Sequence, residues 1–127
     1  MSRVLVIEDE PNIKMVLEII LMEEGHIVMT ASDGLSALEQ LNHTPAPDIV
    51  FVDLHIPVLS GKGIIEKMRS DPVLSNVPVV IMTGSIHNSK DFPPKEYYSA
   101  LIAKPFDIFE VIDTVENLTF KKIKTAI

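Results

Sequence analysis

The sequence of 127 residues contains no cysteine and no long uninterrupted hydrophobic run. Without cysteine the chain can form neither a disulfide nor a thiolate metal site, and nothing in it suggests secretion. No apolar run approaches the length of a membrane-spanning helix, and the apolar segment near the N-terminus is too short for a signal peptide. We therefore expect a cytoplasmic protein with no membrane association.

Basic side chains are scarce in the first half of the chain. Residues 1–60 carry ten acidic and two basic side chains, whereas residues 61–127 carry eight acidic and nine basic ones. An acidic first half disfavours binding to a phosphate backbone, and no nucleic-acid-binding segment is recognisable in the chain. The charge suits a cation site or a partner with basic patches, although a merely soluble acidic surface also explains it.

The composition is otherwise that of a globular protein, with 46% hydrophobic and 23% charged residues. A chain of this length is typical of one domain and can bury a core of its own. We predict a single domain over residues 1–120. The mildly basic residues 121–127 are then either the end of the last helix or the start of a linker.

Short apolar runs alternate with amphipathic segments. The runs predict five strands buried on both faces, at Val4–Ile7, Ile27–Ala31, Ile49–Val52, Val79–Met82 and Ala100–Ala103. Helical spacing of apolar residues, such as Ile13, Val16, Leu17 and Ile20, predicts helices over residues 12–24, 34–42, 62–70 and 107–119. Alternating strands and helices indicate a doubly wound α/β fold, in which five helices cover a five-stranded parallel sheet.

The fourth of these five helices is the exception. It should lie within residues 85–100, but Pro93 and Pro94 stand in this segment and cannot occupy a helix interior. We predict a longer loop up to about residue 92, followed by a short helix that the prolines start.

Polar side chains follow the carboxyl ends of four of the predicted strands: Glu8, Asp9, Asp53, Thr83 and Lys104. Ligands of open parallel sheets bind at this edge, so we expect these side chains to converge. Clustered carboxylates repel one another and favour a bound hard cation. Mg²⁺ is the better candidate because the sequence has no calcium-loop pattern. Asp53 is then a candidate nucleophile, since aspartate forms acyl phosphates.

Four segments together resemble the receiver domain of bacterial two-component response regulators. They are "VLVIEDEP" with an acidic pair, "DIVFVDLHIPVLSG" with a phosphoacceptor aspartate, "VVIMTG" with a switch hydroxyl, and "AKPF" with a lysine–proline turn. Each motif is weak alone, but the four occur in order and at strand ends, and the resemblance covers residues 3–119. It implies a CheY-like (flavodoxin-like) fold with strand order 2-1-3-4-5.

The resemblance implies a phosphorylatable switch of a two-component or phosphorelay system, with slow self-dephosphorylation as its only catalysis. Glu8, Asp9 and Asp53 would bind Mg²⁺, or Mn²⁺ in its place, with Glu8 acting through water. The backbone carbonyl of His55 would be a further metal ligand. Asp53 would accept the phosphoryl group from a phosphohistidine on a sensor histidine kinase or a histidine phosphotransfer protein.

The remaining family positions concern the phosphoryl group and the turns around it. Thr83 and Lys104 would hold phosphoryl oxygens, and the movement of Thr83 would be the switch. Pro57 and Gly61 would shape the turn after the phosphoacceptor. The peptide bond from Lys104 to Pro105 would be cis.

In the family, the first helix docks against the helical partner that carries the histidine. Met15, Ile19 and Met22 form a second apolar stripe on this helix. The stripe either widens the core face or is exposed for docking. Three kinds of partner could receive the signal: a separate protein, an effector domain beyond residue 127, or a second copy of the chain in a homodimer. All three are compatible with the sequence.

The sequence departs from the family on the face that commonly passes on the signal. An aromatic residue usually stands three positions before the lysine, where this chain has Leu101. With the disrupted fourth helix, this leaves a second hypothesis, a receiver-fold binding module that works without phosphorylation. An enzyme on the same architecture is disfavoured. An aspartate-based phosphatase needs an acid at the position of His55, and Glu8 and Asp9 would repel a flavin phosphate.

Overall fold

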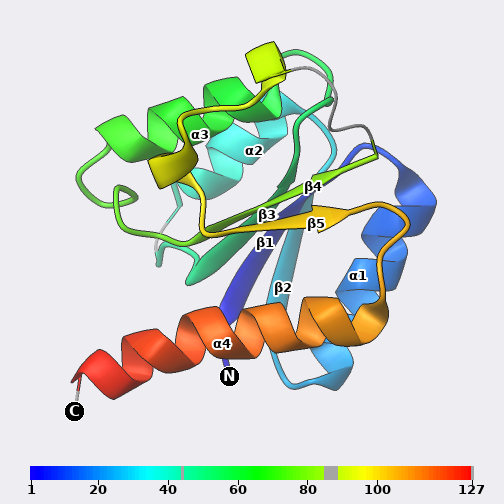
Figure 1. The fold of residues 1–127 in the computed structure, drawn as a ribbon, viewed down its shortest axis with the longest axis vertical. Coiled ribbons are helices and arrows are strands. Elements are labelled where there is room, and N and C mark those ends of the chain that lie inside the picture. The colour runs from blue at the N-terminus through cyan, green and yellow to red at the C-terminus, as the bar shows by residue number, and fades with distance from the viewer. Residues whose placement is uncertain (44, 85–88, 127) are drawn as a thin grey trace.

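A computed structural model of the protein describes residues 1–43, 45–84 and 89–126. Five parallel strands form one sheet in the order β2-β1-β3-β4-β5, as predicted (Figure 1). The strands are β1 (Arg3–Ile7), β2 (Ile27–Ala31), β3 (Ile49–Asp53), β4 (Val79–Thr83) and β5 (Ala100–Ala103). Their bounds agree with the predicted runs to within one residue at each end.

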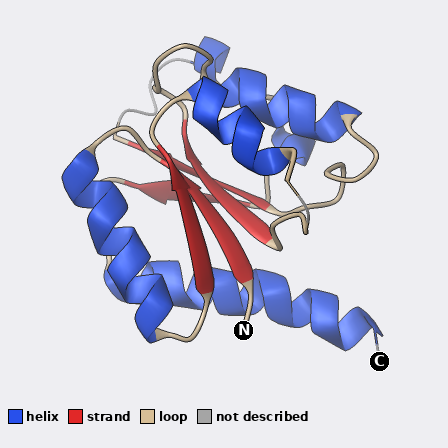
Figure 2. Ribbon diagram, turned by 180° about the vertical axis from the view of Figure 1, so that it is seen from behind, coloured by secondary structure: helices blue, strands red, loops and turns tan. Residues whose placement is uncertain are grey.

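Helices cover both faces of the sheet (Figure 2). One face is covered by α1 (Pro11–Glu23) and α4 (Ile108–Ala126), and the other by α2 (Gly34–Leu41) and α3 (Gly61–Ser70). Four of the predicted helices are therefore present. The last helix continues through residues 121–126 of the predicted tail, and Ile127 lies outside the described residues.

The side chains of β3 alternate between two hydrophobic cores. Val50 and Val52 pack with α2 and α3, whereas Ile49 and Phe51 pack with α1 and α4, and all four side chains are fully buried. A strand that is covered on both faces has no solvent side, which explains its unbroken apolar sequence. Each such side chain contributes about 1.5–3 kcal/mol on burial, so the strand rigidly positions the residue at its carboxyl end.

The core face of α1 differs from the face that the spacing predicted. The buried residues are Leu17 and Leu21, one turn apart, whereas Val16 is 40% exposed. Residues four positions apart lie above one another on a helix. The buried stripe therefore runs through Leu17 and Leu21, and Val16 lies on the solvent side of it.

Two short 3₁₀ turns replace the fourth helix among the described residues, leaving four α-helices. They are η1 (Ser89–Asp91) and η2 (Lys95–Tyr97), and Pro94 is the N-cap of the second. The short helix that the prolines start is confirmed as a single 3₁₀ turn. The predicted loop before it falls partly on residues 85–88, which lie outside the described residues, and its residues 89–91 form the other 3₁₀ turn. Within the described part of the chain, no helix combines the length and apolar character needed to cross a membrane.

Candidate functional site

Three carboxylates meet at the carboxyl edge of the sheet. Ile7 at the end of β1 lies opposite Val52 in β3, so Glu8 and Asp53 leave neighbouring strands side by side. With Asp9 they form a cluster in which one carboxylate oxygen of each residue lies within 4.8 Å of the others. Glu8 is fully buried and Asp53 is 7% exposed, whereas Asp9 faces solvent. We refer to these three residues as the acidic corner.

Lys104 brings a positive charge to the acidic corner. Its Nζ lies 2.5 Å from Oε1 of Glu8 and 2.7 Å from Oδ2 of Asp53. Its backbone N–H donates to the carbonyl of Thr83 at 2.9 Å, which aligns the end of β5 with the end of β4. The bond from Lys104 to Pro105 is cis, as predicted. Four of the five side chains predicted to converge are thus in one place.

Burial and the neighbouring charges have opposite effects on the pKa values of Glu8 and Lys104. Burial raises the pKa of the Glu8 carboxyl above its usual value, and hydrogen bonds from Lys104 and the N–H of Glu10 partly offset this effect. Burial alone would lower the pKa of Lys104, but its hydrogen bonds and charge interactions with Asp53 and Glu8 raise it overall. The ammonium group therefore stays protonated at neutral pH beside the acids.

Both oxygens of the Asp53 carboxylate are oriented by the protein. The backbone N–H of His55 donates to Oδ1 at 2.9 Å, and Nζ of Lys104 donates to Oδ2 at 2.7 Å. The amide contact places His55 against the carboxylate that the sequence singled out. Its predicted contribution of a backbone carbonyl to a metal stays a prediction.

Close backbone packing shapes the turn after Asp53. The N–H of Gly61 donates to the carbonyl of Leu54 at 3.0 Å. A Cβ on Gly61 would lie 2.5 Å from the carbonyl oxygen of Asp53, closer than real Cβ atoms approach. The carbonyl of Pro57 accepts the N–H of Gly34 at 3.0 Å, which joins the turn to α2. These contacts suit the turn roles that we predicted for Pro57 and Gly61.

The side chain of His55 makes a contact that the sequence did not reveal. Its Nε2 lies 3.0 Å from Oδ2 of Asp91 in η1, 36 positions along the chain. The resemblance implied a role only for the backbone carbonyl of His55. No periodicity or motif links the two positions, because their approach depends on the path of the segment after β4.

Thr83 and Leu101 lie in the neighbouring strands β4 and β5, and β5 is an edge strand of the sheet. Thr83 ends β4 and is 1% exposed, in register with Ala103. Leu101 lies opposite Ile81 and is 42% exposed. The predicted switch hydroxyl is therefore at the same edge as the acidic corner, and the position that is usually aromatic presents an aliphatic side chain to solvent.

The apolar stripe on α1 is exposed. Met15, Ile19 and Met22 are 53%, 49% and 57% exposed, and Val16 joins them. The sequence left two explanations open for the stripe, and its exposure excludes a wider core face. We refer to these four residues as the α1 patch.

The donors of the acidic corner fit a hard divalent cation. All three offer carboxylate oxygens, the ligands that Mg²⁺ prefers in proteins. When all groups are ionised, the three carboxylates and the Lys104 ammonium leave a net charge of −2. Glu8, Asp9 and Asp53 are therefore the residues that could hold such an ion.

The sequence profile described as "Response regulator receiver domain" matches residues 4–116. The chain belongs to this family. The resemblance inferred from four motifs is confirmed, and a receiver domain is a phosphoacceptor signalling module rather than a catalytic enzyme.

Curated relatives of this receiver domain differ greatly in length. It is 31% identical to the sporulation initiation phosphotransferase F of Bacillus subtilis, and the match covers 91% of this chain and 92% of the relative. It is 41% identical to the probable transcriptional regulator ycf27 of Guillardia theta, covering 65% of this chain and 31% of that protein. The match to the hybrid signal transduction histidine kinase D of Dictyostelium discoideum, at 32% identity, covers 95% of this chain and 8% of the kinase. The receiver domain spans less than a third of these last two proteins.

Solved structures share the fold of this receiver domain closely. A response regulator receiver domain protein from Clostridium thermocellum has a TM-score of 0.85 and 26% identity, with 98% of this chain and 99% of that chain covered. The response regulator protein TrrA from Thermotoga maritima, solved in complex with Mg²⁺-BeF, has a TM-score of 0.80 and 29% identity, with 93% and 99% covered.

Proposed function

We propose that Asp53 accepts a phosphoryl group from a phosphohistidine on a sensor histidine kinase or a histidine phosphotransfer protein, and that the change alters partner binding. The observation that carries this proposal is the orientation of its carboxylate, with Oδ1 bound to the N–H of His55 and Oδ2 bound to Lys104. The acidic surroundings and the family membership support the same role.

The transfer is a displacement at phosphorus. An oxygen of the Asp53 carboxylate forms the new bond to phosphorus while the phosphorus–nitrogen bond of the phosphohistidine breaks. The electron pair of that bond stays on the imidazole nitrogen, which takes up a proton from solvent. Lys104 would bind a phosphoryl oxygen, and the hydroxyl of Thr83 would donate to another after it moves.

The acidic corner would hold Mg²⁺, with the His55 carbonyl as a further ligand and Mn²⁺ as a substitute. When bound, the ion offsets the negative charge of the phosphoryl oxygens beside three carboxylates. TrrA, which is solved with Mg²⁺-BeF, supports this assignment by its similarity to the chain.

The α1 patch would receive the histidine-bearing partner. Four apolar side chains on one exposed helix face are typical of a docking site rather than of a solvated surface. The names of the relatives, a phosphotransferase and a hybrid histidine kinase, support a phosphorelay partner. A cytoplasmic location is part of the same proposal. The domain would extend over residues 1–120, and the output would lie in another protein, a further domain or a second copy.

Intact mass measurement tests the phosphoacceptor. The protein is incubated with Mg²⁺ and acetyl phosphate, alongside Asp53→Asn and the control Asp113→Asn, which changes an exposed aspartate on α4. We expect one phosphoryl group on the wild type and on the control, none on Asp53→Asn, and none when EDTA removes the metal. Equal phosphorylation of Asp53→Asn, or none of the wild type, would sink the proposal.

The face that commonly passes on the signal in this family is altered in the chain, and this favours a second function. Leu101 is exposed where the family carries an aromatic residue, and 3₁₀ turns replace the fourth helix. Both features suit a binding module that works without phosphorylation, or a weakened or rerouted switch. Amide chemical shifts with and without beryllofluoride, a phosphoryl mimic, separate these functions. A family-type change across residues 89–103 would contradict the second one.

A further inference from the structure

The segment that replaces the fourth helix is held against the body of the protein. Phe92, Tyr97 and Tyr98 are partly buried and pack against the core on the α2 and α3 side of the sheet, and the rings of Phe92 and Tyr98 are 6.3 Å apart. Pro93 between them is buried. We refer to residues 89–98 as the strap. Figure 1 shows it in yellow running alongside α3.

Two side chains of α3 tie the strap at its two ends. Nζ of Lys62, near the start of α3, donates to the carbonyl of Lys90 at 3.2 Å. Nε and Nη2 of Arg69, in the last turn, donate to the carbonyl of Tyr97 at 3.1 and 2.8 Å. Arg69 also donates to the carbonyls of the α3–β4 loop, at Leu74, Ser75 and Val77. The strap is therefore fixed in place over its length.

A third contact links the strap to the phosphoacceptor turn. The imidazole of His55 pairs with Asp91 at 3.0 Å, while the backbone N–H of the same residue donates to Oδ1 of Asp53 at 2.9 Å. His55 is thus in contact with the reacting carboxylate on one side and the strap on the other. A shift of the turn around Asp53 must move the imidazole, and the imidazole must move or release Asp91.

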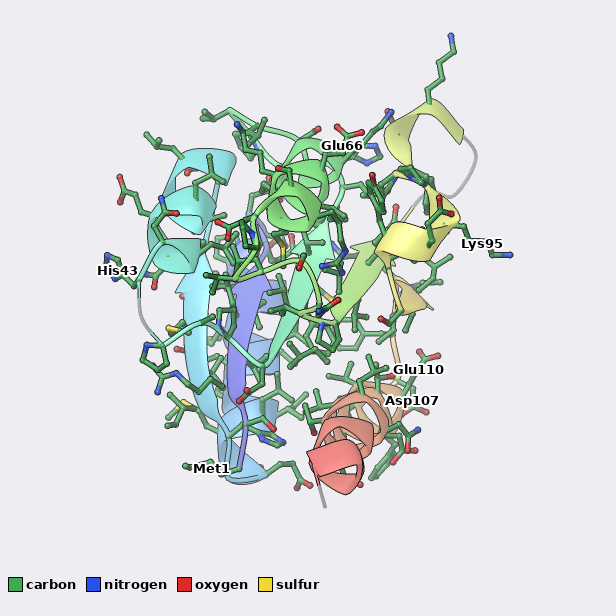
Figure 3. All side chains as sticks on the ribbon, turned by 90° about the vertical axis from the view of Figure 1, so that its left-hand side faces the viewer. Met1, His43, Glu66, Lys95, Asp107 and Glu110 are labelled. Carbon is green, nitrogen blue, oxygen red and sulfur yellow. The ribbon has the colours of Figure 1, made fainter. Side chains whose placement is uncertain are left out.

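We propose that His55 and Asp91 couple the phosphoacceptor turn to the strap, so that the strap carries the state of Asp53 to the output surface. This inference rests on the proposed function of Asp53. His55 acts here as a positioning residue. The family usually has an aromatic residue at the position of Leu101, on the face that passes on the signal, and the His55–Asp91 pair takes over that task in this chain. The exposed outer side of the strap, where Lys95 points away from the body (Figure 3), is then the readout surface.

Coupling between two sites is reciprocal, so the pair must also affect the chemistry at Asp53. If phosphorylation weakens or strengthens the His55–Asp91 contact, removing that contact changes the stability of the phosphorylated state by the same factor. The two side chains are 53% and 39% exposed. For a pair with this exposure we expect a change of about two- to fivefold.

A double-mutant cycle with His55→Gln and Asp91→Asn tests the inference. The dissociation constant of beryllofluoride, a phosphoryl mimic, is measured in the presence of Mg²⁺ for the wild type, both single variants and the double variant. We expect each single change to alter this constant by a similar factor, and the double change to add nothing further. Asp91→Glu, which keeps the charge, is expected to restore most of the wild-type value. Glu96→Gln, an exposed change within the strap, is the matched control and is expected to leave the dissociation constant unchanged.

The amide chemical shifts of residues 89–98 give a second test. If the His55–Asp91 pair were merely structural, its loss would not change how these shifts respond to beryllofluoride. We expect beryllofluoride to shift them in the wild type and in Glu96→Gln, and to leave them nearly unmoved in Asp91→Asn. Independent effects of the two single changes, or an equal strap response in Asp91→Asn, overturn the coupling while leaving Asp53 as phosphoacceptor. If the wild type takes up no phosphoryl group, both proposals fall.

Discussion

Nζ of Lys104 lies 2.7 Å from Oδ2 of Asp53, although the two residues are 51 positions apart. They meet because parallel strands end at the same edge of the sheet, so the residue after β5 reaches across to the last residue of β3. Lys104 also pairs with the fully buried Glu8. A single ammonium group therefore balances two carboxylates, and this balance determines how the site responds to mutation.

Replacing Lys104 by methionine should destabilise the protein. The change removes the partner of two largely buried carboxylates, and loss of one member of a buried ion pair costs about 3 kcal/mol. Urea unfolding at pH 7 should show a lower free energy of unfolding for Lys104→Met. Lys95→Met, which alters an exposed side chain of η2, should stay within about 0.5 kcal/mol of the wild type. Equal stability of the two variants would show that the ion pairs contribute nothing.

Mg²⁺ should raise the melting temperature through the acidic corner. Binding to the folded state alone stabilises it by about 2.7 kcal/mol at a hundred times the dissociation constant. Asp9→Asn should melt at or above the wild-type temperature without metal, because it removes repulsion among clustered carboxylates, and should gain little from added Mg²⁺. Differential scanning calorimetry with Asp113→Asn as control checks this. A full Mg²⁺ response in Asp9→Asn would exclude it as a ligand.

Gly61→Ala should destabilise the turn that carries the phosphoacceptor. The added Cβ would lie 2.5 Å from the carbonyl oxygen of Asp53 and 2.8 Å from Cα of Leu54, and both are backbone atoms that cannot simply rotate away. We expect a loss of about 2 kcal/mol or more in thermal unfolding. At Gly84 the same change meets a single atom, 4.0 Å away on Lys104, and should be well tolerated. Comparable melting temperatures for Gly61→Ala and the wild type would contradict the packing argument.

Protonation of His26 should destabilise the protein as the pH falls. Burial lowers the pKa of His26 below its ordinary value of 6.5, the amino group of Met1 lowers it further, and Glu24 and Glu116 oppose this shift. The unfolded chain therefore binds more protons than the folded protein below about pH 6.5. The stability that neutral His26 contributes is complete above that pH. It is lost as the pH falls further, through the lowered pKa that His26 has in the folded protein. Structurally, Nδ1 of His26 accepts the backbone N–H of Ser2 at 3.1 Å, which a doubly protonated ring cannot do.

His26→Asn isolates this contribution. Asparagine offers a side-chain oxygen in place of Nδ1 but does not titrate, so the variant should lose less stability between pH 7 and pH 5 than the wild type. Chemical denaturation at half-unit pH steps measures the difference. Parallel stability curves for the two proteins would rule out His26 as the titrating group.

Much of this protein follows from the sequence by itself. Apolar runs that alternate with amphipathic segments predict the parallel sheet, because a strand covered on both faces must be apolar throughout. The polar residues that end these runs then have to meet at one edge. The positions of Glu8, Asp53, Thr83 and Lys104 were predictable for that reason, as was the absence of a regular helix around Pro93 and Pro94.

The tertiary structure alone decided the contacts that do not repeat along the chain. Helical spacing marks apolar stripes without saying which one faces the sheet, so the burial of Leu21 and the exposure of Val16 became evident only once α1 was packed. The pairing of His55 with Asp91 and of Arg69 with the carbonyl of Tyr97 joins residues 36 and 28 positions apart. Such contacts depend on the path of an irregular segment, which no local periodicity encodes. The first joins the phosphoacceptor turn to the strap, and the second joins α3 to it.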